Sequence, residues 1–72
     1  MIVKAPSALI IQMVSVKEGE KVKEGDTLMM GEVMKNMIFI ASPTAGKISR
    51  IYYSPGALVQ EGASLIKIEE GE

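Results

Sequence analysis

Residues 18–28, EGEKVKEGDTL, decide the fold of this chain because residues 54–65, SPGALVQEGASL, repeat their pattern. An offset of 37 positions pairs Gly19 with Gly56, Val22 with Val59, Glu24 with Glu61, Gly25 with Gly62, and Leu28 with Leu65. The same offset pairs Pro6 with Pro43, Ala8 with Ala45, Ile11 with Ile48, and Val14 with Ile51. Two copies are too few for a solenoid, which needs at least about three repeats. The repeat therefore predicts a closed structure with internal two-fold pseudo-symmetry.

Short runs rich in β-branched residues, separated by glycine and proline, predict strands. We expect strands at residues 2–5, 10–16, 27–32, 37–41, 47–53 and 64–69, with short extended pieces at 21–23 and 58–60. No segment keeps a 3.6-residue apolar period for ten positions, so almost no helix is expected. The predicted fold class is all-β, a flattened β-barrel or sandwich of two small antiparallel sheets. We expect one domain over residues 1–72.

Composition excludes several classes of function. The chain has 72 residues, a net charge of −1, and neither cysteine nor histidine. A thiolate nucleophile, a zinc–thiolate site and a histidine base are therefore absent, and we expect no catalytic or metal-ligating residue. The eight basic residues are mixed with nine acidic ones, and only three aromatic residues are present, so no nucleic-acid partner is expected. Apolar runs are far shorter than a membrane span, so we expect no membrane association and a cytoplasmic location.

One lysine has a unique place in the repeat. The first copy runs into the second through residues 33–36, and the predicted strands on either side make this segment a hairpin turn. The turn places Lys35 in solvent, and Asn36 tolerates turn conformations well. Met34 is harder to explain by folding alone, because turns are not part of the core.

The remaining methionines and carboxylates have ordinary interpretations. The methionines expected as pliable core filler are Met13, Met29, Met30 and Met37. The carboxylates that alternate with lysines in turns, and so predict a solvated surface, are Glu18, Glu20, Glu24, Asp26 and Glu61. Glu32 has two interpretations of equal weight. It is either a strand-end residue mirrored by Glu69 or a functional flank of the lysine turn.

The motif EVMK at residues 32–35, at the centre of a two-copy β repeat, resembles the attachment motif of biotinyl domains, the biotin carboxyl carrier family. That family usually has Glu, then Ala, Ser or Val, then Met-Lys-Met or Met-Lys-Leu. The resemblance covers nearly the whole chain, from residues 5–6 to residues 65–69, and Pro43 and Gly46 also lie where the family has them. A bare Met-Lys pair is common, so the pair is informative only because of its place in the repeat.

The resemblance implies a function without catalysis. Biotin would form an amide with Lys35, delivered by a biotin protein ligase as an acyl-adenylate. The flanking residues that the ligase would read are Glu32, Val33, Met34 and Asn36. The resulting flexible arm would carry carboxyl groups between the biotin carboxylase and carboxyltransferase components of a biotin-dependent carboxylase. Tethering would raise the effective concentration of biotin at each site.

Three residues depart from the family's pattern. Asn36 stands where Met or Leu is usual, Gly31 replaces an apolar residue, and Leu9 stands where glycine is common. An amide side chain offers no apolar area to a ligase pocket, so we expect Asn36 to slow biotinylation. Met37, one residue later, is a candidate to restore an apolar flank.

Other assignments remain open at this point. Lipoyl domains share the fold and the turn lysine, so a lipoyl carrier of a 2-oxo acid dehydrogenase-type complex is one alternative, although Met34 favours biotin. An unmodified interaction hairpin, as in transporter adaptor proteins, is another. Within the biotinyl family, Val33 and the stretch SPGALV at residues 54–59 resemble the carrier domain of acetyl-CoA carboxylase, an enzyme of fatty acid biosynthesis.

Overall fold

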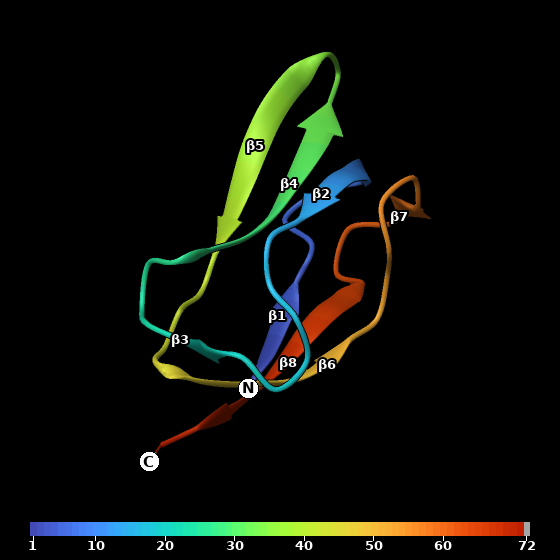
Figure 1. The fold of residues 1–72 in the computed structure, drawn as a ribbon. Coiled ribbons are helices and arrows are strands. Elements are labelled where there is room, and N and C mark those ends of the chain that lie inside the picture. The colour runs from blue at the N-terminus through green and yellow to red at the C-terminus, as the bar shows by residue number, and fades with distance from the viewer. Residues whose placement is uncertain (72) are drawn as a thin grey trace.

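In residues 1–71, the part of the chain that the computed structural model describes, eight strands form two antiparallel four-stranded sheets (Figure 1). The strands are β1 (Ile2–Lys4), β2 (Leu9–Val14), β3 (Lys21–Val22), β4 (Thr27–Val33), β5 (Asn36–Ala41), β6 (Gly46–Ile51), β7 (Leu58–Val59) and β8 (Ser64–Glu70). The terminal sheet has the order β1-β8-β6-β3, and the hairpin sheet has the order β5-β4-β2-β7. The all-β prediction is confirmed. Residues 1–71 contain no helix that is long and apolar enough to span a membrane.

The 37-residue repeat relates the strands of one sheet to the strands of the other. Adding 37 to the bounds of β2, β3 and β4 gives the bounds of β6, β7 and β8. The pairing agrees as well, since Ile10 lies opposite Glu32 in the hairpin sheet and the equivalent Lys47 lies opposite Glu69 in the terminal sheet. Both ladders carry a register shift at the equivalent place, in β2 and in β6. The backbone thus confirms the two-fold pseudo-symmetry that the repeat predicts.

Two predicted strands extend two residues too far. Residues 15–16 and 52–53 lie outside β2 and β6, which end two residues earlier than expected. After β2 the chain crosses from the hairpin sheet to the terminal sheet, where the N–H of Gly19 donates to the carbonyl oxygen of Ile48 over 2.7 Å. Val16 lies in this crossing and is buried. Val16 is a core residue in a segment that is not a strand. The local sequence pattern does not distinguish a buried residue in a strand from a buried residue in such a crossing.

Four tight turns of one kind connect the strands. Each has a glycine with positive φ at its third position: Gly19 (92°), Gly25 (92°), Gly56 (96°) and Gly62 (85°). In each turn the fourth N–H donates to the first carbonyl oxygen over 3.0–3.2 Å, which with this φ is a type II turn. Two carboxylates close their own turns, since Glu20 accepts from the Lys17 N–H and Asp26 from the Lys23 N–H. These acidic residues are exposed, as predicted for a solvated surface.

The core lies between the inner faces of the two sheets, and every strand contributes to it. Its buried apolar residues are Val3, Ala5, Leu9, Ile11, Val16, Val22, Leu28, Met29, Ile40, Ile48, Val59, Leu65, Ile66 and Ile68. A domain of this size buries only about 60% of the surface that its unfolded chain exposes. Each of these side chains therefore carries a large share of the stability.

The methionines divide between the two faces of the hairpin sheet. Met29 is fully buried and confirms the prediction of core filler. Met30 is half-buried, Met13 and Met37 are about half exposed, and none of the three belongs to the core or packs against it, so the prediction is wrong for these three. The register shift in β2 lies between Ile11 and Met13, which leaves Met13 on the solvent side. Neighbouring strand residues point to opposite faces, so Met37 points away from the core that Ile38 and Ile40 contact.

Two of the departures from the family pattern compensate each other in space. A Cβ built on Gly31 would lie 2.8 Å from Cδ1 of Leu9, so the Leu9 side chain occupies the space that a side chain at position 31 would need. In the other half, a Cβ on Gly46 would lie 2.7 Å from Cγ2 of Ile68. Positions 9 and 46 are equivalent, as are 31 and 68. The hairpin sheet therefore pairs a bulky Leu9 with Gly31. The terminal sheet has the reverse arrangement, with glycine at position 46 and a bulky isoleucine at position 68.

This exchange predicts strong coupling between positions 9 and 31. We expect Leu9→Gly to destabilise the fold by about 2–5 kcal/mol, as for other large-to-small core changes. Gly31→Ile alone should cost about 1–3 kcal/mol through overpacking. The double variant should recover part of both losses, because the new isoleucine fills the space that leucine vacates. Urea unfolding of the four proteins measures the coupling, and strictly additive losses would contradict the contact.

Candidate functional site

The candidate site is the loop that joins β4 to β5. Val33 and Asn36 are the last paired residues, so Met34 and Lys35 form a two-residue hairpin loop. Both have positive φ, 50° for Met34 and 70° for Lys35. Positive φ at both central residues defines the type I′ turn, whose twist matches that of the flanking strands. The predicted hairpin turn at the lysine is present.

The residues in this turn are unsuited to it. Type I′ turns favour Asn-Gly, Asp-Gly and Gly-Gly, because L-residues with larger side chains crowd the following carbonyl in the left-handed region. The cost is roughly 1–2 kcal/mol per residue. Within residues 1–71, Met34 and Lys35 are the two non-glycine residues with positive φ. Backbone strain of this kind persists where the surroundings enforce it, and it gathers at functional sites.

The hairpin presents both residues to solvent. Met34 is 89% exposed, and Lys35 is exposed as well. The molecule measures 37 × 18 × 18 Å, and the hairpin projects from the end opposite to Met1 and to the end of β8 (Figure 1). The lysine amine is therefore accessible to another protein without interference from the body of the fold.

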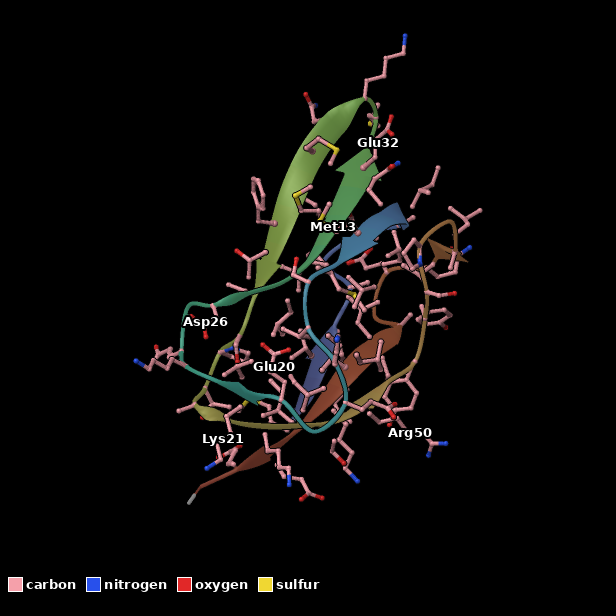
Figure 2. All side chains as sticks on the ribbon, in the orientation of Figure 1. Met13, Glu20, Lys21, Asp26, Glu32 and Arg50 are labelled. Carbon is pink, nitrogen blue, oxygen red and sulfur yellow. The ribbon has the colours of Figure 1, made fainter. Side chains whose placement is uncertain are left out.

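Glu32 is held in place by a neighbour that sequence reasoning missed. Its Oε1 accepts a hydrogen bond of 2.9 Å from Nε2 of Gln12 on β2. Figure 2 shows Glu32 near the turn between β4 and β5. The equivalent pair in the terminal sheet is Ser49 and Glu69, whose side chains lie 3.5 Å apart between donor and acceptor oxygens. The repeat offset shows that the two pairs are equivalent, but the contact itself depends on the register of β2 against β4, which the sequence does not give. The mirrored pair supports the strand-end interpretation of Glu32.

The two residues beside the turn have different surroundings. Val33 is half-buried and packs against the core, whereas Asn36 is exposed. The turn spans residues 33–36 as predicted, with Asn36 at its last position, where it is also the first residue of β5 and pairs with Val33. Alternation along β5 places Asn36 on the same face as Ile38, and Met37 on the opposite face next to Glu32. Met37 therefore does not replace an apolar side chain at position 36.

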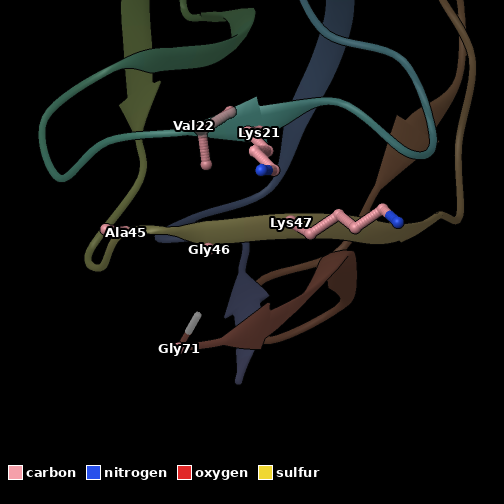
Figure 3. A pocket seen from close by; sticks show the side chains of 6 residues that line it. All are labelled: Lys21, Val22, Ala45, Gly46, Lys47 and Gly71. Atoms are coloured by element: carbon pink, nitrogen blue, oxygen red, sulfur yellow. The ribbon is translucent and has the colours of Figure 1, made fainter.

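The rest of the described chain offers no competing site. A depression of about 310 Å³ lies beside the terminal sheet (Figure 3), and the residues that line it are Lys21, Val22, Ala45, Gly46, Lys47 and Gly71. Two lysines line it, and no carboxylate or histidine is among the lining residues to act as their acid–base partner. Within residues 1–71, no three carboxylates gather in a way that could hold a metal ion. The hairpin is the part of the surface with unusual chemistry.

Comparisons with known proteins place this chain in a family. A family model described as "Biotin-requiring enzyme" matches residues 1–68. The chain is 40% identical over 68 residues to the mitochondrial methylcrotonoyl-CoA carboxylase subunit alpha of Mus musculus, covering 94% of this chain but only 10% of that protein. It is 34% identical over 68 residues to the biotin carboxyl carrier protein of acetyl-CoA carboxylase of Solanum lycopersicum, covering 94% of this chain and 97% of that one.

Solved structures agree with this assignment. A single-chain, multi-domain long-chain acyl-CoA carboxylase superposes with a TM-score of 0.86 at 29% identity, over 92% of this chain and 6% of that one. The Kluyveromyces lactis urea carboxylase superposes with a TM-score of 0.90 at 20% identity, over 96% of this chain and 6% of that one, which shows the shared fold. The family match over residues 1–68 and the identity along nearly all of a carrier protein lead to one conclusion: the chain belongs to the biotin-requiring enzyme family, as a biotin carboxyl carrier domain.

Proposed function

We propose that Lys35 is the residue that carries biotin, and that a biotin protein ligase is the enzyme that attaches it. The observation that carries this proposal is the strained, exposed Met34–Lys35 turn at the end of the molecule. The other lysines lie on strands or in the type II turns of the body: Lys4, Lys17, Lys21, Lys23, Lys47 and Lys67. The Lys35 turn therefore fits a covalently attached group that must reach beyond the domain.

Each residue of the hairpin has a distinct part in this proposal. Lys35 supplies the nitrogen of an amide with the acyl carbon of biotinyl-adenylate, and the bond from that carbon to AMP breaks as the amide forms. The nitrogen loses its charge in this step, so the ligase must also accept a proton. Met34 gives the ligase an apolar contact beside the amine. Glu32, fixed by Gln12, and Val33, packed on the core, hold the strand that supports the turn.

The carrier function follows from the length and freedom of the arm. When attached, biotin supplies the atom that accepts and releases the carboxyl group. The domain keeps that arm at the end of a rigid hairpin and raises its effective concentration at the biotin carboxylase and carboxyltransferase sites. The matches to methylcrotonoyl-CoA and acetyl-CoA carboxylase proteins support an acyl-CoA carboxylase as the enzyme served. A cytoplasmic location stays a prediction.

The attachment site is tested by a change that keeps charge and approximate length. We expect Lys35→Arg to take up no biotin from a biotin ligase, because guanidinium is a poor acyl acceptor near neutral pH. Wild-type chain and the control variant Lys67→Arg, changed on β8, should each gain one biotin by intact-mass measurement. Label on the Lys35→Arg variant would exclude this site. Modification of the wild type by lipoate ligase but not biotin ligase would support the lipoyl alternative.

The strain in the turn predicts that a variant with a relaxed turn is more stable but loses the modification. We expect the combined change Met34→Asn and Lys35→Gly to raise the free energy of unfolding by about 1–2 kcal/mol, because these residues adopt positive φ at lower cost. The same variant cannot be biotinylated at this position. Urea unfolding compared with the wild type measures the gain. Unchanged or lower stability would mean that the turn is not strained.

Asn36 is proposed as a handicap for modification. Asn36→Met places an apolar side chain on the Val33 side of the hairpin, where a ligase pocket could bury it. A fully buried methionine contributes roughly 1.5–3 kcal/mol, so even partial burial predicts a several-fold increase in kcat/KM for biotinylation. Asn36→Gln, which keeps the amide, is the matched control and should leave the rate close to that of the wild type. Equal rates for the methionine and glutamine variants would show that position 36 does not contribute.

A further inference from the structure

The pseudo-two-fold symmetry of the backbone is broken on the outer faces of the two sheets. The outer face of the hairpin sheet carries an apolar face, formed by Ile10, Met13, Met30, Met37, Phe39 and Leu58. The outer face of the terminal sheet carries a basic face, formed by Lys21, Lys47, Arg50 and Lys67. Met13 of the first face and Lys21 and Arg50 of the second are labelled in Figure 2, on different parts of the molecule.

The apolar face is continuous across four strands. One row of cross-strand neighbours runs from Met37 through Glu32 and Ile10 to Leu58, and the next row contains Phe39, Met30 and Met13. Phe39 is 66% exposed and Leu58 is 68% exposed. Contiguous exposed apolar surface of this kind marks interaction sites. Methionine side chains suit such a surface because they are flexible and adapt to a partner.

The fold does not require these apolar side chains. Ile10, Met13, Met30 and Leu58 are equivalent by the repeat to Lys47, Arg50, Lys67 and Lys21. The two sets occupy the same register in ladders that share the same irregularities. The terminal sheet thus shows that this backbone accepts lysine and arginine at these positions. The apolar residues on the hairpin sheet therefore serve something outside the fold.

We propose that the apolar face docks the biotinylated chain on the carboxylase protein that it serves. This inference rests on the function proposed for Lys35. The partner surface is apolar and carries a basic side chain that meets Glu32. The position of the face supports this, because Glu32 and Met37 lie opposite one another just before and after the turn. A protein bound there lies beside the group that Lys35 presents.

Charge distinguishes this partner from a second copy of the chain. Glu32 is the acidic residue within the rows of the apolar face, and two copies packed face to face would bring two carboxylates into one apolar interface. Burying like charges together is costly. A basic group on the partner compensates Glu32 instead, and the basic face repels the same group, which fixes the orientation of docking.

The covered lengths of the relatives support a carboxylase as the partner. The matched region is 10% of the mouse methylcrotonoyl-CoA carboxylase subunit and 6% of the long-chain acyl-CoA carboxylase chain. In those proteins it belongs to the same chain as a much larger carboxylase. A tethered carrier works at high effective concentration, so a small apolar face suffices for repeated docking.

The repeat also supplies the test variants. Ile10→Lys combined with Leu58→Lys copies the pair Lys47 and Lys21 onto the apolar face, in a register that already accepts it. The matched control is Lys21→Gln combined with Lys47→Gln on the basic face. Both variants and the wild type are loaded with biotin, and intact mass confirms loading before any further measurement. Thermal unfolding confirms that all three are folded.

The measurement is the rate of carboxylation by the biotin carboxylase component of the same organism, with ATP and bicarbonate, at varied carrier concentration. We expect the apolar-face variant to raise KM at least tenfold with kcat within twofold, and the control to stay within twofold in both. Free biotin as substrate should be turned over at the same rate in every sample. Failure to load biotin on Lys35 would refute the proposed function, and would be seen at the first step.

Three results would overturn the docking proposal while biotin loading succeeds. The first is an unchanged KM for the apolar-face variant. The second is a wild-type chain that is used no better than free biotin, which would mean that no docking occurs. The third is a wild-type dimer in sedimentation that the variant converts to a monomer, which would make the apolar face a contact between copies.

Discussion

The burial of two inner sheet faces against each other is the constraint on which the whole molecule depends. Each copy of the repeat contributes two strands to each sheet, so neither sheet, and neither inner face, is complete without the other copy. Leu28 and Leu65, equivalent in the repeat, are both fully buried. Because the core fixes both sheets, β4 and β5 can extend beyond it and hold a turn that their own residues disfavour. In the proposed function, this extended hairpin is the part of the fold that carries the biotinylated lysine.

Much of the fold could be predicted from the sequence because the repeat and the glycine turns are local signals. Gly19, Gly25, Gly56 and Gly62 divide the chain, and the positive φ that each adopts is one that other residues rarely accept. The faces of the strands were harder to predict. A register shift in β2 puts Met13 on the solvent side, and one extra residue in a strand reverses the alternation that local reasoning uses.

The lysine turn was predicted in position but not in conformation. The repeat places Lys35 between the two halves, and that placement needs no knowledge of the turn. The turn itself uses Met34 and Lys35 in a conformation for which their side chains are poor choices, so propensity points to Asn36 instead. The hydrogen bond between Gln12 and Glu32 joins residues on different strands, and only the register of β2 against β4 reveals it.

The pairing of Leu9 with Gly31 has a consequence for how such a domain changes over generations. A chain that passes from glycine at position 9 and a bulky residue at 31 to the present arrangement must change both positions. Either change made first leaves a cavity or a clash in a thin core. The two residues are therefore expected to covary among relatives, so that each appears as an anomaly in its own alignment column. Considered together, Leu9 and Gly31 fill the same volume that glycine at position 9 and a bulky residue at position 31 would fill.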